Sequence, residues 1–328
     1  MSAHHSDRHR DTHRDSPRDP LADSGLAIVD KPAGMTSHDV VAKLRRIYGT
    51  RKVGHAGTLD PMATGVLVAG IERGTKFLAH ITASTKSYKA TIRLGAATTT
   101  DDREGEVTFT ADPEVITALD DASIDRAVAD LTGDIMQRPT AVSAIKINGK
   151  RAHKRVRAGE DVEIPARPVT VSRFDVVDRR RGGSHRADGF VDLNVEVDCS
   201  SGTYIRALAR DLGEALGVGG HLTALRRTAV GPFTLADAQQ LDDLANAQDS
   251  AHGPDLSLSL DEALARCYPV VRIRNEEADM LAMGKWLEPC GLKGVHAAVA
   301  DDGRAVALVK ESKHRLHTVF VARPSTLQ

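Results

Sequence analysis

Residues Gly54 to Gly65 read GHAGTLDPMATG. They place one carboxylate, Asp60, among Gly, Ala, Thr and Pro, and no second acidic residue lies between Val53 and Ile71. Small residues let backbone or a ligand approach closely, and Pro61 fixes the backbone directly after the acid. The segment is therefore suited to hold one carboxylate in a defined direction. A simple Asp-Pro turn is the plainer interpretation of the same residues.

The composition is that of an ordinary globular protein. The chain has 328 residues, of which 41% are hydrophobic and 27% charged, and its net charge of −1 does not exclude local basic patches. No apolar run approaches the roughly 18 residues of a membrane span, and the polar start does not resemble a secretory signal. Three widely separated cysteines predict a reducing compartment, without a disulfide framework or a zinc site. We therefore expect a cytoplasmic protein that does not enter a membrane.

The sequence divides into three parts. Residues 1–24 are rich in His, Arg, Asp and Ser and predict a disordered tail. Residues 25–247 alternate strand and helix patterns and predict one α+β domain with a largely antiparallel sheet. Residues 248–328 begin with a polar linker and continue with short β runs, which predicts a small β-rich module. Helices are expected from a Ser37 cap to Tyr48, from a Thr203 cap to Leu216, and over Leu235–Ala245.

Two segments alternate as half-buried strands do. In Phe190 to Cys199 every second residue is apolar, and SYKATIRL, ending at Leu94, shows the same period. Tyr88 therefore lies near the start of a strand and points to its apolar side. Taken alone, it is an ordinary core tyrosine.

The cations are concentrated in a few places. Arg206 lies in the first turn of a predicted helix, where the helix dipole disfavours a positive charge, so an active-site carboxylate is its natural partner. The segment Arg138 to Arg157 carries seven cations and no Asp or Glu, with Asn148-Gly149 at a hairpin position. Such a run is either solvated or faces phosphate, and we favour phosphate. The polar stretch Thr98–Glu106 and the basic stretch Arg179–Gly189 read as loops.

Four segments in order resemble one family. KVGHAGTLDPMATGVL resembles the catalytic segment of the bacterial tRNA pseudouridine synthase B (TruB) family, and GLAIVDKPAGMTSHD, TGDIMQRPTAVSAIKINGKRAH and CSSGTYIRALARDLG with HLTALRRTAVGPF extend the match from Gly25 to Phe233. The resemblance implies a pseudouridine synthase fold, with a central mostly antiparallel sheet flanked by helices and a PUA-like C-terminal domain. The implied partner is tRNA, without a cofactor, a metal or an obligate protein partner, and a monomer is expected.

The resemblance also assigns roles to residues. Asp60 is the implied nucleophile, Tyr88 stacks on the target base, and Arg206 pairs with Asp60. His55 helps displace the target nucleotide, and Tyr204 and Leu225 line the pocket. The remaining implied RNA contacts are Lys31, Arg138, Lys146, Lys150 and Arg151. His153-Lys154 departs from the Tyr-Glu common in the family, which removes an expected aromatic contact there.

The implied reaction breaks an N-glycosidic bond of the T-loop uridine, turns the base and rejoins it through carbon. The target base must be flipped out of its loop, and stacking on an aromatic residue offsets part of that cost. Asp60 could attack the ribose C1′, attack the base, or deprotonate C2′, and Tyr88 is a hypothetical base for the C5 proton. Two other classes stay open: an RNA-folding factor without essential catalysis, and metal-dependent hydrolysis through His55 and Asp60, which lack further ligands nearby.

Overall fold

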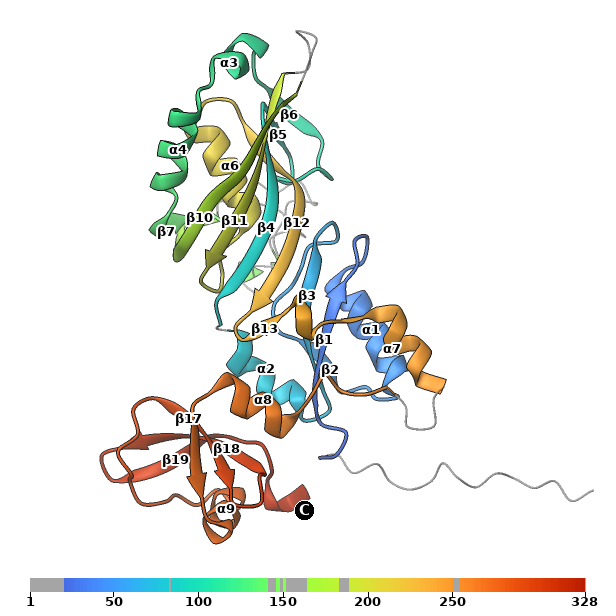
Figure 1. The fold of residues 1–328 in the computed structure, drawn as a ribbon, viewed down its shortest axis with the longest axis vertical. Coiled ribbons are helices and arrows are strands. Elements are labelled where there is room, and N and C mark those ends of the chain that lie inside the picture. Colours follow the sequence, from blue (N-terminus) through green and yellow to red (C-terminus); the bar gives the residue numbers. More distant parts are fainter. Residues whose placement is uncertain are drawn as a thin grey trace, which may run out of the picture.

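The computed structural model describes residues 21–82, 84–140, 146–147, 150–151, 164–182, 189–249 and 254–327. Figure 1 shows a long central sheet, helices against it, and a small second sheet at the C-terminal end. Within these ranges no helix combines the length and the apolar character needed to cross a bilayer. The predicted tail falls outside the described residues up to residue 20. Ser24, at its expected end, is already buried.

The central sheet crosses most of the molecule. Its strands follow the order β14 (Gln239–Gln240), β1 (Gly25–Lys31), β3 (Thr64–Ile71), β12 (Gly220–Val230), β4 (Lys86–Leu94), β11 (Phe190–Cys199), β10 (Arg167–Gly182) and β7 (Gly133–Gln137). Only the β1–β14 and β3–β12 pairs of this series are parallel. The expectation of a mostly antiparallel sheet is therefore confirmed. Three short strands, β2 (Val53–His55), β13 (Phe233–Thr234) and β15 (Leu258–Ser259), pair with β3, β12 and β1.

Alternation along the strands sets which face is covered. Every second residue of β11 is buried, as its sequence predicts, and Val197 lies opposite Tyr88 of β4. Three helices cover that apolar face: α3 (Pro113–Ala118), α4 (Asp121–Asp130) and α6 (Ile205–Ala215). The other end of the sheet packs against α1 (Ser37–Ile47), α2 (Gly74–Thr82) and α7 (Leu241–Asn246) (Figure 1). Two short hairpins complete this part: β5 (Ala96–Thr98) with β6 (Val107–Thr110), and β8 (Lys146–Ile147) with β9 (Lys150–Arg151).

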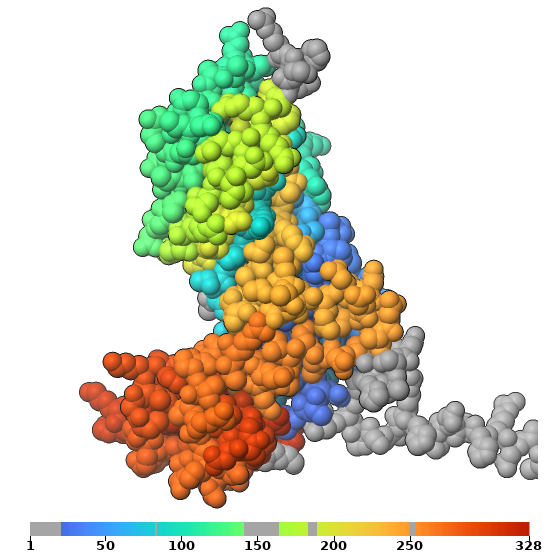
Figure 2. Space-filling view, viewed as in Figure 1, coloured from blue at the N-terminus to red at the C-terminus, as the bar shows by residue number. Residues whose placement is uncertain are grey.

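The C-terminal module is a four-stranded sheet in the order β16 (Val270–Ile273), β17 (Val295–Ala300), β18 (Ala305–Ser312) and β19 (Arg315–Val321). Helix α9 (Asn275–Ala282) packs on it. A second helix, α8 (Leu260–Cys267), contacts both β1 and β18 and was not predicted. Figure 2 shows this module, in orange and red, packed directly against the rest of the chain.

Several expected boundaries of helices and loops were wrong, because of capping bonds or of pairing with another strand. Thr36, not Ser37, caps α1, through a reciprocal bond with Asp39. Thr203 does not cap α6, whose N-cap is Tyr204 without a side-chain bond. The expected helix over 235–245 divides into a 3₁₀ turn at Leu235–Asp237, strand β14 and α7, because β14 pairs with the edge of β1. The expected loop starting at 179 is strand as far as Gly182, since β10 stays paired with β11.

Candidate active site

Ser37 of helix α1 holds the backbone of the Asp60 loop at Leu59. This buried serine lies in the first turn of α1, and its Oγ accepts a hydrogen bond from the Leu59 backbone N–H at 2.9 Å. The same hydroxyl lies 3.2 Å from the Leu59 carbonyl, to which it can donate. The residue directly before Asp60 is therefore tied to a helix on both of its backbone polar groups.

Arg227 of β12 holds the other side of the loop. Its side chain is 1% exposed, and all three of its guanidinium nitrogens donate to backbone carbonyls. Nε bonds Val66 at 2.7 Å, Nη1 bonds Thr58 at 3.3 Å, and Nη2 bonds Gly57 at 3.1 Å. Arg227 thus binds the loop to its own sheet.

Lys31 supports the turn that follows Asp60. Its ammonium donates to the carbonyls of Pro32 at 2.9 Å, Met35 at 2.6 Å and Pro61 at 3.3 Å. Burial lowers the pKa of Lys31 to about 8. The side chain is fully buried, so in this conformation it cannot reach RNA, and its expected role as an RNA contact is replaced by one inside the protein.

Asp60 and Arg206 meet, as the sequence predicts. Nη2 of Arg206 donates to Asp60 Oδ1 at 2.9 Å, and Nη1 donates to the Thr100 carbonyl at 2.9 Å. Nη1 also lies 3.4 Å from Oδ2 of a second buried carboxylate, Asp102. Arg206 is therefore fixed between two acids, which accounts for a buried cation in the first turn of α6.

The pKa of Asp60 is raised above its usual value. Burial raises the pKa of this carboxyl, the Arg206 guanidinium opposes the rise, and the negative charge of Asp102 adds to it. The side chain keeps 31% of its surface exposed, so it can meet a ligand. A carboxylate of this kind is paired yet accessible, which a nucleophile or base requires.

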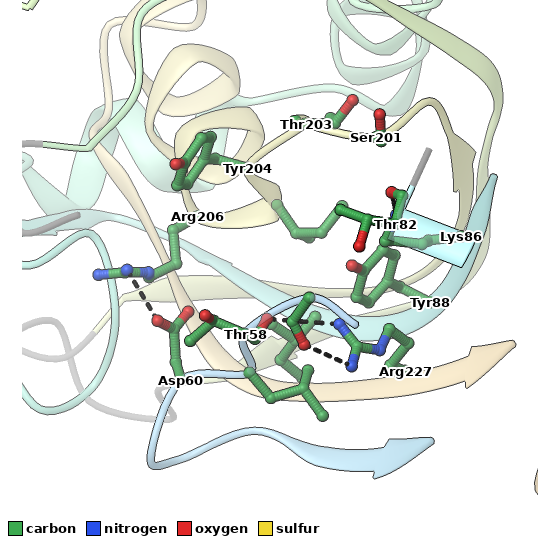
Figure 3. Close-up of a pocket in the computed structure, with 15 residues that line it drawn as sticks. Thr58, Asp60, Thr82, Lys86, Tyr88, Ser201, Thr203, Tyr204, Arg206 and Arg227 are labelled. Carbon is green, nitrogen blue, oxygen red and sulfur yellow. Dashed lines mark hydrogen bonds and ion pairs between the residues drawn. The ribbon is translucent and has the colours of Figure 1, made fainter. Parts of the chain in front are cut away.

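A cavity of about 320 Å³ opens next to this pair. Figure 3 shows Asp60 and Arg206 at one end and Tyr88, Lys86 and Arg227 at the other. Tyr204 and Leu225 also line it, as the sequence predicts. Tyr88 is buried, and burial raises the pKa of its hydroxyl. The lining of the cavity therefore offers a carboxylate, an aromatic ring and two cations besides Arg206 to one ligand.

Other predicted residues lie outside the cavity. His55 is half-buried on β2, with its ring 5.6 Å from that of His38, and burial lowers its pKa. Arg138 is exposed, and its carbonyl accepts a hydrogen bond from Arg210. The backbones of β8 and β9 pair as the hairpin prediction requires, but the side chains of Lys146, Lys150 and Arg151 fall outside the described residues. Across the described ranges, no three His, Cys, Asp or Glu side chains gather as metal ligands would.

Four residues of the site were missed from the sequence. Ser37 was expected as a cap, Arg227 was expected within a loop-and-strand segment without a role of its own, and Asp102 was expected in a polar loop. Lys86 was not singled out, although it lies two residues before Tyr88 and so shares its strand face. That spacing was the available signal for Lys86, whereas Asp102 has no comparable signal, because acidic residues in polar loops are usually exposed.

Known proteins match along the chain. The TruB family pseudouridylate synthase N-terminal domain matches residues 45–205, the tRNA pseudouridylate synthase B C-terminal domain 206–266, and the tRNA Pseudouridine synthase II C-terminal model 268–323. A Corynebacterium aurimucosum protein named tRNA pseudouridine synthase B is 71% identical over 94% of this chain and 99% of its own length. A Nocardia farcinica protein of the same name is 60% identical over 92% and 94%. The chain belongs to the TruB family of pseudouridylate synthases.

Solved structures agree with this TruB assignment at the level of fold. A chain from the crystal structure of a Cbf5-Nop10-Gar1 complex has a TM-score of 0.68 at 24% identity, covering 98% of this chain and 94% of that one. A chain from the structure of an H/ACA RNP bound to a substrate RNA containing 2′-deoxyuridine has a TM-score of 0.67 at 23% identity, covering 94% and 87%. The TruB chain therefore has the pseudouridine synthase fold that its motifs imply.

Proposed function

We propose that this TruB-family chain isomerises the T-loop uridine of tRNA to pseudouridine, with Asp60 as the nucleophile. The observation that carries the proposal is the Asp60–Arg206 pair at 2.9 Å on the wall of a cavity that also exposes Tyr88. Relatives that are 71% and 67% identical bear the name tRNA pseudouridine synthase B, which supports the same reaction and the same substrate class.

The geometry suits each step that the reaction needs. The Arg206 guanidinium opposes the rise that burial causes in the pKa of Asp60, and so favours the ionised carboxylate that attack requires. The flipped base would stack on Tyr88, which offsets about 1–3 kcal/mol of the unstacking cost. Because the isomerisation is redox-neutral, it needs no cofactor. Tyr88 would accept or relay the C5 proton once the base has turned.

The wider setting follows from the substrate. Arg138, with Lys146, Lys150 and Arg151 of the β8–β9 hairpin, would contact RNA phosphates, and His55 would help displace the target nucleotide. The C-terminal module from residue 248 onward would add RNA contacts of its own. A tRNA-modifying monomer of this kind would work in the cytoplasm, without a membrane or an obligate protein partner.

The test uses an unmodified tRNA transcript tritiated at uridine C5. We expect the wild-type protein to release tritium from the T-loop uridine, and Asp60→Asn to release at least ~10⁴-fold less while binding the transcript equally well. Tight binding by wild type without release would instead favour an RNA-folding factor.

The role of Tyr88 is tested in the same assay. Tyr88→Phe keeps the stacking ring but removes the hydroxyl, so it should bind RNA and stall before tritium release. Full turnover by this variant would remove Tyr88 from the proton transfer and leave it as a stacking residue.

A further inference from the structure

The cavity end away from Asp60 contains two buried cations. Lys86 is 8% exposed and Arg227 1% exposed, and both line the cavity. A Cβ placed on Gly57 would lie 3.5 Å from Lys86 Cε and 3.6 Å from Arg227 Nη1, so the two side chains converge on one point. Burying one charge is costly, and burying two like charges together is more so.

Neither cation is neutralised within the described part of the chain. The Lys86 ammonium donates to the carbonyls of Thr82 at 3.1 Å and Ser84 at 2.9 Å, which leaves one of its three N–H groups. Arg227 donates to three carbonyls, as described above, and its guanidinium also hydrogen-bonds the Tyr88 hydroxyl, so the groups that it bonds are neutral. Arg206, at the other end, is matched by two carboxylates. The far end therefore offers positive charge to a ligand that enters the cavity.

We propose that Lys86, supported by Arg227, is a further catalytic residue that stabilises the negative charge on the uracil ring during isomerisation. This inference rests on the proposed function, since it assigns a role to the far end of the same cavity. Lys86 would contact the O2 or O4 edge of the base, and Arg227 would hold the Gly57–Thr58 backbone while adding its own field.

The charge arises in every route open to Asp60. Attack at C1′ breaks the C1′–N1 bond, and the electron pair passes to N1 and spreads over O2 and O4. Removal of the C2′ proton by Asp60, with elimination, sends the same pair to N1. Addition to C6 of the ring sends a pair to O4. Each route leaves the base anionic, and a preorganised donor aimed at developing charge in a buried site lowers the barrier most.

The position of the two cations favours the base over an RNA phosphate. Asp60 must meet the ribose or the near edge of the base, and Tyr88 lies across the cavity from Asp60, at the same end as Lys86 and Arg227 (Figure 3). The base therefore extends from Asp60 across Tyr88 toward Lys86. A phosphodiester stays joined to both neighbouring nucleotides, so it would remain outside the cavity, whereas Lys86 and Arg227 are 8% and 1% exposed.

The pKa of Lys86 is lowered, as expected for a buried cation beside a second cation. Burial, followed by the positive charge of Arg227, lowers the pKa of this ammonium to about 8, and Cys199 acts weakly in the opposite direction. Lys86 also bonds the last carbonyl of α2, which is the plainer, structural explanation for a lysine here. The experiment must separate the two roles.

The experiment compares two RNA substrates, with uridine or 5-fluorouridine at the target position, in single turnovers. Fluorine disperses negative charge on the ring, so it makes stabilisation by Lys86 less important. We expect Lys86→Met to lower the rate of target-nucleoside loss about 10²–10³-fold with uridine. With 5-fluorouridine, the fold-decrease caused by the same substitution should be at least about tenfold smaller. Quenched samples are digested to nucleosides and analysed by mass spectrometry, and RNA affinity is measured on the same protein.

Three further variants keep the test decisive. Lys86→Gln is neutral but retains an N–H for the Thr82 carbonyl, so it should fold and show the same substrate-dependent loss. Lys86→Arg retains the charge and should stay within about tenfold of wild type. Lys76→Met removes an exposed lysine from α2, the helix whose Thr82 carbonyl Lys86 bonds, and should change neither rate.

Three results would overturn the inference: no loss of rate, an equal loss with both substrates, or a weaker RNA affinity that accounts for the whole loss. The last would assign the cations to the RNA backbone. A wild-type protein that releases no tritium from uridine would refute the proposed function itself, whereas normal release by wild type and by Lys86→Gln would refute this inference alone.

Discussion

The two ends of the cavity solve the problem of buried charge in opposite ways. At one end, Arg206 lies between Asp60 and Asp102, so each charge has a partner. At the other, Lys86 and Arg227 bond carbonyls and the Tyr88 hydroxyl, and no carboxylate of the described ranges pairs with them. Buried ions are normally paired because desolvation is costly. The paired end is therefore set up before a ligand arrives, while the unpaired end is completed by what enters.

The comparison is tested most strongly by removing the central acid. Asp60→Asn should lower the single-turnover rate at least ~10⁴-fold. Unlike Lys86→Met, it should do so equally with uridine and 5-fluorouridine, because a better-stabilised ring anion does not replace a missing nucleophile. A selective recovery with 5-fluorouridine would show that both ends act on the same charge.

Removing Arg206 should have the next largest effect. Arg206→Gln leaves Asp60 and the buried Asp102 without their shared cation, so we expect a rate loss of about 10²–10³-fold, which corresponds to about 3–4 kcal/mol of transition-state stabilisation. The guanidinium opposes the rise in the pKa of Asp60, so its loss raises that pKa further. Activity needs the ionised acid and is lost as pH falls through its pKa. The acidic limb of the pH–rate profile should therefore move to higher pH.

Asp102→Asn is the matched opposite. The negative charge of Asp102 raises the pKa of Asp60, so its removal should move the acidic limb to lower pH. The rate on the plateau should fall only about tenfold, since Arg206 keeps its bonds to Asp60 and Thr100. If both variants move the limb in the same direction, the two acids do not share Arg206 in the way that the structure shows.

The smallest effect concerns the support of the loop. Ser37→Ala leaves the buried Leu59 N–H without its partner, which costs about 1–3 kcal/mol of stability and displaces Asp60, so a rate loss of several-fold is expected. Thr36→Ala removes the adjacent helix cap at a cost of about 1 kcal/mol, without a bond to the loop. Similar destabilisation with a rate loss in Ser37→Ala alone would separate positioning from stability, as measured by thermal unfolding and single turnovers.

The local patterns predicted the strands better than they predicted the site. Phe190–Cys199 forms β11 as its alternation requires, and the charge conflict at Arg206 predicted a carboxylate partner. The helix over 235–245 was wrong because its apolar spacing carried no information about an available edge on β1. Arg227 and Asp102 were missed because their partners lie more than 100 residues away along the chain. The boundary at residues 247–248 stays a prediction.

Helix α8 fixes the C-terminal module against the central sheet, because it contacts both β1 and β18. Its Leu260 and Leu264 share one apolar cluster with Leu26 of the central sheet and Leu308 of the C-terminal sheet. Arg73 adds a bond to the Ala322 carbonyl at 2.5 Å. The two parts are thus joined by a shared apolar core and not only by a linker, so packing sets the distance between the cavity and the C-terminal module. A nucleic acid that contacts both the cavity and the C-terminal module would have to match that fixed distance.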